Sequence, residues 1–168
     1  MNINTILNSG DVVRFHNHSG IDKQRNSEHQ WGVALVLNYI YPNASKELIL
    51  AAMTHDAAEY YTGDVPFPVK KDHPELSHLL RKIEKQWEAC NDVYFDYSQI
   101  EELALKVSDT LEGMKYCIKQ VRLGNINAKR PFRKWSQFFI DNLLSKCEKT
   151  LPKSLELFSK LLREMEEL

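Results

Sequence analysis

The chain has 168 residues, of which 43% are hydrophobic and 27% are charged, and its formal net charge is -1. This length suits one ordinary domain with a hydrophobic core, and the near-neutral charge argues against a general attraction to nucleic-acid polymers or anionic membranes. Three widely spaced cysteines without a CxxC pair argue against a disulfide framework and a thiolate metal site, and the lack of a signal-peptide pattern or of an apolar run of bilayer length favours a cytoplasmic protein.

The N-terminal part of the chain predicts one short element and one long helix. The first 25 residues are mixed and polar, which is typical of a turn or short helix followed by a loop around residues 18–20. A helix is expected from Ser27, because Ser27 and Gln30 fit an S-x-x-Q capping box and the segment is then strongly apolar through Tyr41. Pro42 ends this helix.

The spacing of apolar residues and the positions of proline and glycine predict the remaining helices. In chain order they cover about residues 43–62, 74–87, 98–122, 134–150 and 152–167, with loops at 63–68 and 124–131. No segment is predicted as a strand, since the run 93–95 is too brief. The pattern indicates an all-α protein, a single-domain helical bundle over residues 1–168.

Polar residues on apolar helix faces are the main functional signal. Asp56 lies on the same stripe of the 43–62 helix as Met53 and Tyr60, and Glu59 lies close to that stripe. His29 shares a face with the apolar residues of the preceding helix. Burying an unpaired carboxylate is costly, so a cation or strong hydrogen-bond donors must meet it.

Two imidazoles and two carboxylates on packed helices suit a divalent transition metal such as Zn, Mn, Co, Ni or Fe better than Ca²⁺. An open position on such a metal lowers the pKa of bound water and creates a hydroxide nucleophile near neutral pH. Asp109 lies off the apolar stripe of its helix, so periodicity alone predicts that it is exposed. A helix buried on two sides would reconcile an inward Asp109 with this pattern.

The order of these residues, His29, then His55-Asp56, then Asp109, resembles the H…HD…D pattern of the HD-domain metal-dependent phosphohydrolases. Longer segments look like the bacterial 5′-deoxynucleotidase branch of that family. These segments are Arg14-Phe15, Asn26-Ser27-Glu28-His29, His55-Asp56-Ala57-Ala58-Glu59, the sequence TGDVPFPVK at 62–70, and KVSDTL at 106–111. The likeness covers a metal core at about 11–125, and C-terminal helices follow at about 132–168.

The resemblance implies a role for each matching residue and an HD-type helical bundle as the fold. His29, His55, Asp56 and Asp109 would hold a divalent transition metal (Co, Mn or Zn). Glu59 would act as the acid or base, and Asp64 would anchor substrate or a second metal, for which Mg²⁺ is a candidate. Arg14 and Lys70 would bind phosphate, and Phe15 would stack on the base or wall off the ribose 2′ position.

Phage dATP triphosphohydrolases of this branch look similar, because they share an Arg-aromatic-His start and a Gln before the first histidine, here Arg14-Phe15-His16 and Gln24. His16 and Gln24 are therefore expected at the substrate. Phe15 stands where the bacterial enzymes have tryptophan. Residues 129–134 are basic and are expected in a turn, where they could meet additional phosphates, whereas Trp135, Phe138 and Phe139 are expected in the core or at a subunit interface.

We therefore expect a metal-dependent phosphohydrolase of 2′-deoxynucleotides, with dATP triphosphohydrolysis to deoxynucleoside and triphosphate as the favoured reaction. The alternative reaction is that of a 5′-deoxynucleotidase, which cleaves dNMP to deoxynucleoside and phosphate. A non-catalytic nucleotide-sensing HD module and a helical interaction protein also stay open, while the TGDVP segment disfavours cyclic nucleotides and guanosine alarmones. The resemblance further implies a homo-oligomer (dimer or higher), located in the host cytoplasm if the protein is viral. From the near-neutral charge we expect no nucleic-acid polymer and no membrane as partner.

Overall fold

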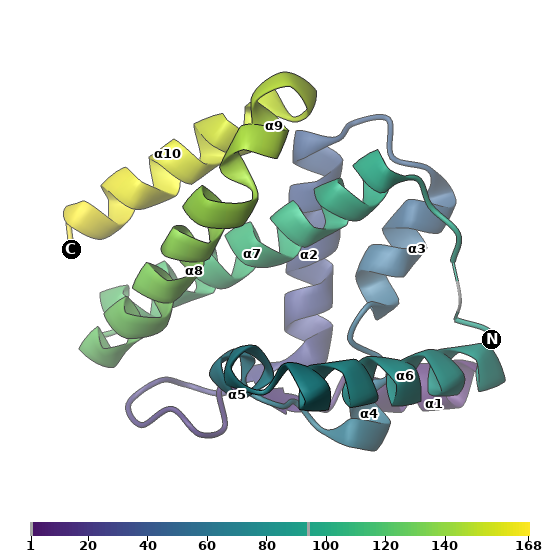
Figure 1. Ribbon diagram of the computed structural model, residues 1–168. Coiled ribbons are helices and arrows are strands. Elements are labelled where there is room, and N and C mark those ends of the chain that lie inside the picture. The colour runs from purple at the N-terminus through teal and green to yellow at the C-terminus, as the bar shows by residue number, and fades with distance from the viewer. Residues whose placement is uncertain (1, 94) are drawn as a thin grey trace.

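The computed structural model describes residues 2–93 and 95–168, and most of this chain is helical (Figure 1). Its elements are α1 (Ile3–Ser9), β1 (Val13–Arg14), β2 (Gln24–Arg25), α2 (Asn26–Ile40), α3 (Lys46–Thr54), α4 (Glu59–Thr62), α5 (Phe67–Asp72), α6 (Pro74–Cys90), α7 (Gln99–Arg122), the 3₁₀ turn η1 (Ile126–Ala128), α8 (Lys129–Asn142), α9 (Leu144–Thr150) and α10 (Pro152–Glu166). The predicted all-α class is thus confirmed.

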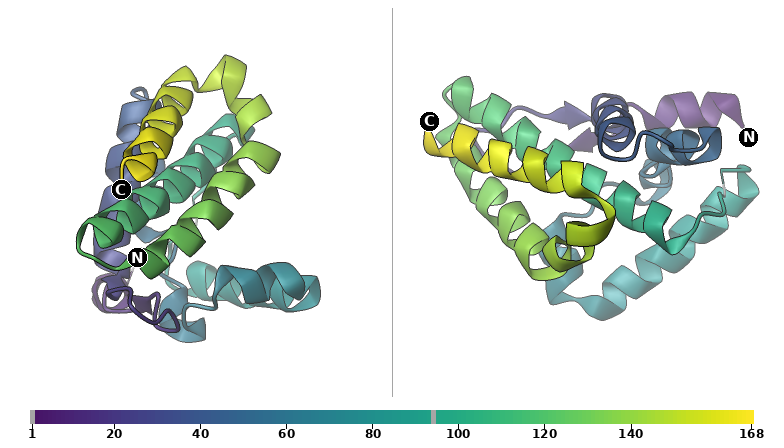
Figure 2. Two further views of the ribbon diagram at one scale, coloured as in Figure 1. Left: turned by 90° about the vertical axis from the view of Figure 1, so that its left-hand side faces the viewer. Right: turned by 90° about the horizontal axis from the view of Figure 1, so that it is seen from above.

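Helix α7 lies at the centre of the fold, with α2, α3, α8 and α10 packed against it. In the left view of Figure 2 it lies between α8 and α10, and it contacts both. A capping box between Ser98 and Glu101 begins the helix, in agreement with the predicted start. Its buried residues point in nearly every direction around the axis. This explains how Asp109 turns inward although it lies off the main apolar stripe.

Two short strands, which the sequence did not predict, lead into α2. Val13 pairs with Arg25 and Arg14 with Gln24 in an antiparallel ladder. The backbone N–H groups of Asn26 and Ser27 then donate to carbonyls of the segment before β1. These bonds satisfy the first donors of α2, so the helix begins at Asn26 and the predicted Ser27 capping box does not form. The run 93–95 was predicted to be too short for a strand, and this prediction includes Tyr94, which lies outside the described residues.

The single helix predicted over 43–62 is wrong, because α3 ends at Thr54 and α4 begins at Glu59. His55 is the C-cap of α3, and its Nδ1 lies 2.8 Å from the carbonyl oxygen of Ala52. The four-residue turn between the two helices changes which residues face inward. Met53 and Tyr60, predicted to share a buried stripe with Asp56, are 47% and 49% exposed.

Three other predicted boundaries shift for local reasons. The loop predicted at 63–68 ends early because α5 begins at Phe67, with Pro68 in its first turn. Proline is tolerated there because backbone N–H groups of the first turn have no acceptor within the helix. The basic residues 129–134 lie in the first turns of α8 and not in a turn between helices. The helix predicted at 134–150 is divided at Leu143, whose side chain is buried in the core.

Helix α6 begins at Pro74 as predicted and packs on α4 and α5, at one side of the molecule (Figure 1). None of its residues is fully buried, so its apolar face is only half covered. Within the described residues, no helix combines the length and apolar character needed to cross a membrane.

Candidate metal centre and cavity

The four predicted ligand residues come together where three helices meet. His29 projects from α2, Asp109 from α7, and His55 and Asp56 from the turn after α3. The Nε2 atom of His29 lies 3.2 Å from Asp109 Oδ1 and 3.6 Å from Asp56 Oδ2, and His55 Nε2 lies 3.4 Å from the same Asp56 oxygen. Segments 80 residues apart in the chain thus surround one point.

Both imidazoles direct a free nitrogen at this point. Nδ1 of His29 faces the Glu112 carboxylate, and Nδ1 of His55 faces the Ala52 carbonyl. Each Nδ1 therefore serves as donor, which leaves Nε2 as the nitrogen that can offer its lone pair to a metal. Both Nε2 atoms are buried without a hydrogen-bond partner. One ligand atom from each of His29, His55 and Asp109 lies within 4.8 Å of the other two. Two imidazole nitrogens and a carboxylate oxygen are a suitable donor set for a transition metal.

Several charged side chains lie close to this point and shift one another's pKa values. Burial acts to raise the pKa of Asp109, but the Lys106 ammonium and the His29 ring outweigh it and hold that pKa well below its usual range. Burial likewise acts against the charged form of Asp56, yet His55 and Arg14 keep its pKa low. For His29, burial and Arg14 act to lower the pKa, but the facing carboxylates of Asp109 and Glu112 raise it to about 9. Without a metal, His29 is therefore an imidazolium at neutral pH, with a second proton at Nε2 in addition to the one at Nδ1.

That proton leads to a testable expectation for metal loading. A metal bound at Nε2 must displace the proton, and a pKa of about 9 means that the metal-free protein still holds it at pH 7.5. We expect about one proton to leave His29 per metal ion at pH 7.5 and progressively less above pH 9. Calorimetric titration of Zn²⁺ in two buffers of different ionisation enthalpy measures the number. Heats that do not depend on the buffer would contradict the expectation.

A second group of charged residues lies beside the two histidines. The Arg14 guanidinium donates a hydrogen bond to Asp56. Burial acts to lower the pKa of Arg14, but the negative charges of Asp56 and Asp109 outweigh burial and raise that pKa. Glu59 is buried, with Asn26 Nδ2 3.2 Å from one carboxylate oxygen and Lys70 Nζ 3.6 Å from the other. Burial and the neighbouring Asp56 raise the pKa of Glu59 to about 8. Glu59 is thus mostly protonated at neutral pH.

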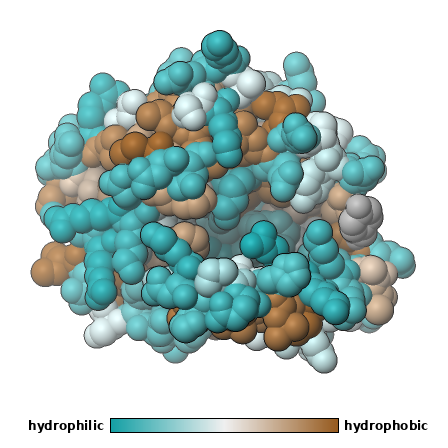
Figure 3. Space-filling model, in the orientation of Figure 1, coloured by the Kyte–Doolittle hydropathy of each residue, from teal (hydrophilic) through white to brown (hydrophobic). Residues whose placement is uncertain are grey.

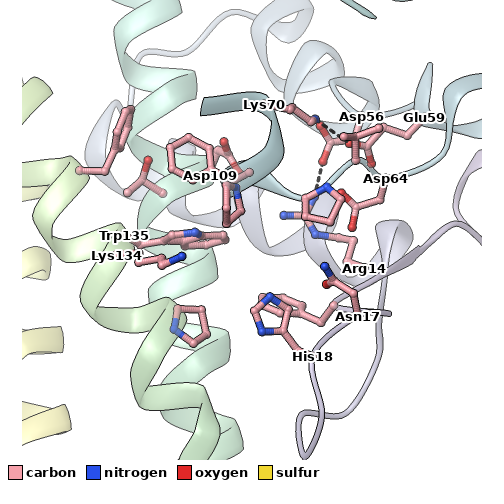
Figure 4. A pocket seen from close by; sticks show the side chains of 18 of the residues that line it. Arg14, Asn17, His18, Asp56, Glu59, Asp64, Lys70, Asp109, Lys134 and Trp135 are labelled. Atoms are coloured by element: carbon pink, nitrogen blue, oxygen red, sulfur yellow. Dashed lines mark hydrogen bonds and ion pairs between the residues drawn. The ribbon is translucent and has the colours of Figure 1, made fainter. Parts of the chain in front are cut away.

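These groups line one side of a cavity of about 470 Å³. Hydrophilic residues surround the hollow on the face seen in Figure 3. Figure 4 shows Arg14, Asp56, Glu59, Asp64 and Lys70 on one side and α8, with Lys134 and Trp135, on the other. Its lining also includes Phe15, Asn17, His18, Val65, Pro66, Phe67, Pro68, Lys106, Asp109, Thr110, Arg130, Pro131 and Phe138. The volume suits a small phosphorylated molecule.

Aromatic side chains form the apolar part of the cavity. Phe15 has a φ of 57°, a left-handed conformation that is strained for a bulky residue. Its ring stacks on Tyr116 with a centroid separation of 5.2 Å and lies 6.3 Å from Trp135. Trp135 packs directly over Gly113 of α7, where a Cβ atom would lie 0.9 Å from the indole ring. The absence of a side chain at Gly113 therefore allows α8 to place this ring at the cavity.

The remaining predicted site residues lie at different distances from this centre. His16 is exposed and its Nδ1 lies 3.8 Å from Asp64, but His16 does not line the cavity. Gln24 is buried and donates to Glu112, so its amide faces away from the cavity. Substrate contact by His16 and Gln24 stays a prediction. Trp135 and Phe138, expected in the core or at an interface, line the cavity, whereas Phe139 is fully buried as expected.

Sequence reasoning missed three residues at the site. Glu112 lies three residues after Asp109, a spacing that places both on one side of α7 and could have suggested it. Asn26 donates to the Asp56 backbone and to Glu59. Lys106 lies 2.8 Å from Asp109 and lines the cavity. Asn26 and Lys106 both lie in segments that resemble the family, but a role was predicted there only for His29 and Asp109.

Comparison with known proteins identifies related chains. A family model described as 5′-deoxynucleotidase YfbR-like matches residues 10–162. A 5′-deoxynucleotidase of Yersinia pestis (strain Pestoides F) is 30% identical over 97 residues, covering 48% of this chain and 49% of the relative, and one of Yersinia pseudotuberculosis serotype O:1b (strain IP 31758) matches equally. The chain spans about half the length of the curated relatives it matches.

A solved structure shares the arrangement of the helices. The cyanophage S-2L HD phosphohydrolase (DatZ), bound to dA and one catalytic Zn²⁺ ion, superposes with a TM-score of 0.68 at 21% identity. The match covers 100% of this chain and 98% of the phage chain. The predicted HD-type helical fold is therefore confirmed.

Proposed function

The chain belongs to the YfbR-like 5′-deoxynucleotidase family, and on this premise we propose that it is a metal-dependent phosphohydrolase of 2′-deoxynucleotides. One observation carries the proposal: two buried imidazole nitrogens without partners and two carboxylates converge beside a cavity whose lining includes several cationic side chains. His29, His55, Asp56 and Asp109 would hold the metal. When bound, a divalent transition metal polarises a phosphoryl oxygen and activates water near neutral pH.

The cationic side chains of the cavity would bind the phosphate. Arg14 is permanently charged, and its fork-shaped guanidinium suits two phosphate oxygens. Lys70 supplies a further point charge from the adjacent helix α5. Both also contact carboxylates, Arg14 with Asp56 and Lys70 with Glu59, and these contacts fix their positions at the cavity wall. The phosphate would therefore be held before reaction with little reorganisation of the site.

Glu59 would provide the proton that the reaction requires. A sugar 5′-oxygen that leaves phosphorus must be protonated, because an alkoxide is a poor leaving group at neutral pH. The raised pKa of about 8 keeps Glu59 protonated at pH 7, and the bond from Asn26 orients its carboxyl group. Asp64 lines the same wall and would anchor substrate or a second metal. Phe15 and Trp135 would pack against the base or sugar.

Within this function we favour a deoxynucleoside triphosphate, with dATP as the first candidate. Arg130 and Lys134 of α8 are exposed and line the cavity opposite Arg14. In the described residues, no carboxylate lies within 4.0 Å of either cation, so both charges are available to a ligand. A monophosphate would leave them unused. The bound dA named for the phage relative supports adenine as the base. The Yersinia relatives are 5′-deoxynucleotidases by name, which favours the monophosphate alternative.

A product analysis tests the proposal. The purified protein is incubated with Zn²⁺, Mn²⁺ or Co²⁺ and with dAMP, dATP, dGTP and ATP in turn. We expect deoxyadenosine and inorganic triphosphate from dATP, and little turnover of ATP. Inorganic phosphate from dAMP without triphosphate from dATP would establish the 5′-deoxynucleotidase alternative. Nucleotide binding without turnover in any metal would leave a sensing module.

The two cations of α8 give a further expected result. The double variant Arg130→Gln, Lys134→Gln should raise KM for dATP by about tenfold or more, because even one hydrogen bond to a charged group contributes about 1.5–3 kcal/mol and about 1.4 kcal/mol corresponds to tenfold. The KM for dAMP should change little. Arg133→Gln is the matched control, since Arg133 is exposed on the same helix and does not line the cavity. Equal changes in KM for dATP and dAMP would argue against a distal phosphate site.

A further inference from the structure

The side chain of Glu112 occupies a buried position between α7 and α2. One carboxylate oxygen accepts a hydrogen bond from His29 Nδ1, and the other accepts one from Gln24 Nε2 at 2.8 Å. His29 is completely buried and Glu112 is 9% exposed. A buried carboxylate of this kind needs strong donors on both oxygens, and these two bonds supply them.

The fold makes room for this carboxylate at a specific place. Gly32 lies on α2, one turn after His29, and a Cβ atom there would lie 2.7 Å from Glu112 Cγ. Any larger residue at Gly32 would push the carboxylate away from the ring. Gln24 holds the far oxygen from strand β2. Three elements thus combine to fix the position of Glu112.

Glu112 and Asp109 act on the two nitrogens of a single ring. They lie three residues apart on α7, where Asp109 Oδ1 is 3.2 Å from Nε2 and Glu112 faces Nδ1. His55 is held differently, because its Nδ1 donates only to the backbone carbonyl of Ala52. A carboxylate increases the basicity of the imidazole that donates to it more than a neutral carbonyl does. The two histidines should therefore differ as ligands.

We propose that Glu112, supported by Gln24 and admitted by Gly32, is a positioning residue that fixes the tautomer of His29 and makes it the stronger of the two imidazole ligands. This inference depends on the metal site of the proposed function. Glu112 does not line the cavity, so it would act on the metal only through His29. The substitution Glu112→Gln removes its charge at nearly constant shape. Outer carboxylates of this kind typically change metal affinity by roughly 10- to 100-fold.

Zinc affinity measured without substrate tests the inference. Competition with a chromogenic chelator gives the Kd of the wild type, Glu112→Gln and Glu102→Gln. Glu102 lies on the same helix and is exposed, and its side chain forms no hydrogen bond or ion pair within the described part of the chain, so it is the matched control. We expect roughly 10- to 100-fold weaker Zn²⁺ binding for Glu112→Gln and no change for Glu102→Gln. In the zinc-loaded wild type, NMR should also show a far-downfield Nδ1 proton of His29 that moves upfield in Glu112→Gln.

The outcomes separate this inference from the proposed function. Wild-type affinity in Glu112→Gln, with an unchanged Nδ1 proton, overturns the inference and leaves the phosphohydrolase proposal standing. A wild type that binds no Zn²⁺ overturns both. If Glu112→Gln does not fold, Gln24→Met provides the answer, because it removes the donor to Glu112 and keeps the carboxylate. That variant should bind Zn²⁺ several-fold more weakly, and unchanged affinity would overturn the inference.

Discussion

Replacing Asp109 with asparagine is expected to abolish stoichiometric metal binding and to lower kcat/KM by about a thousandfold or more. Metal stabilisation of the reacting phosphate contributes several kcal/mol, and roughly 4 kcal/mol corresponds to three powers of ten in rate. Asp109 also balances His29 at 3.2 Å and Lys106 at 2.8 Å. The amide keeps the shape of the side chain but removes the anion that both cations face. Metal analysis after dialysis and single-turnover assays measure the two effects.

Asp141→Asn serves as the control for Asp109→Asn. Asp141 is exposed on α8, does not line the cavity, and receives the same chemical change. It should keep its metal content and its activity. Because Asp109 is only about one-fifth exposed and faces the fully buried His29, its substitution should also lower the folding stability of the metal-free protein, and thermal unfolding measures that loss apart from the loss of metal. Normal activity in a metal-replete Asp109→Asn protein would remove Asp109 from the ligand set and with it the proposed site.

The position of Asp109 shows what helical periodicity can and cannot predict. Periodicity assigned the start of α7 and its apolar residues correctly, because the capping box and the long stripe are local features. It also predicted an exposed Asp109, since a single stripe assumes one buried face. In the fold, α2, α3, α8 and α10 surround α7, so several faces are buried. Which faces a helix buries depends on its neighbours, and only the family resemblance placed Asp109 correctly.

The turn at His55 was unpredictable for a related reason. Residues 46–62 have helical spacing throughout, and no proline or glycine marks the break. The helix ends at its C-cap His55, whose Nδ1 bonds locally to the Ala52 carbonyl and whose Nε2 belongs to the group formed with His29 and Asp109. Glu112 was missed because its partners, His29 and Gln24, are more than 80 residues away in sequence. Residues that only support others carry little local signal. The basic start of α8 was predicted as a turn and is helical, yet Arg130 and Lys134 of this segment line the cavity.

Glu59→Gln is expected to lower kcat by roughly 10²- to 10⁴-fold while leaving metal affinity nearly unchanged. The amide oxygen can still accept the hydrogen bond from Asn26, so the side chain keeps its place. The amide has no acidic proton to transfer to the leaving oxygen. Glu75→Gln is the control, because Glu75 is 77% exposed at the start of α6. Rapid-quench measurement of deoxynucleoside release isolates the chemical step.

The pH dependence of the wild type decides which way the proton moves. A proton donor must be protonated, so with a pKa of about 8 Glu59 is active below pH 8 and loses activity as the pH rises through that value. A bound cation would lower this pKa, so the alkaline limb of the loaded enzyme should lie at or below pH 8. The residual activity of Glu59→Gln should lack this limb. Wild-type activity that instead rises between pH 6 and 8 on ionisation of Glu59 would mean that this carboxylate accepts a proton from water, and the leaving oxygen would then require a different acid.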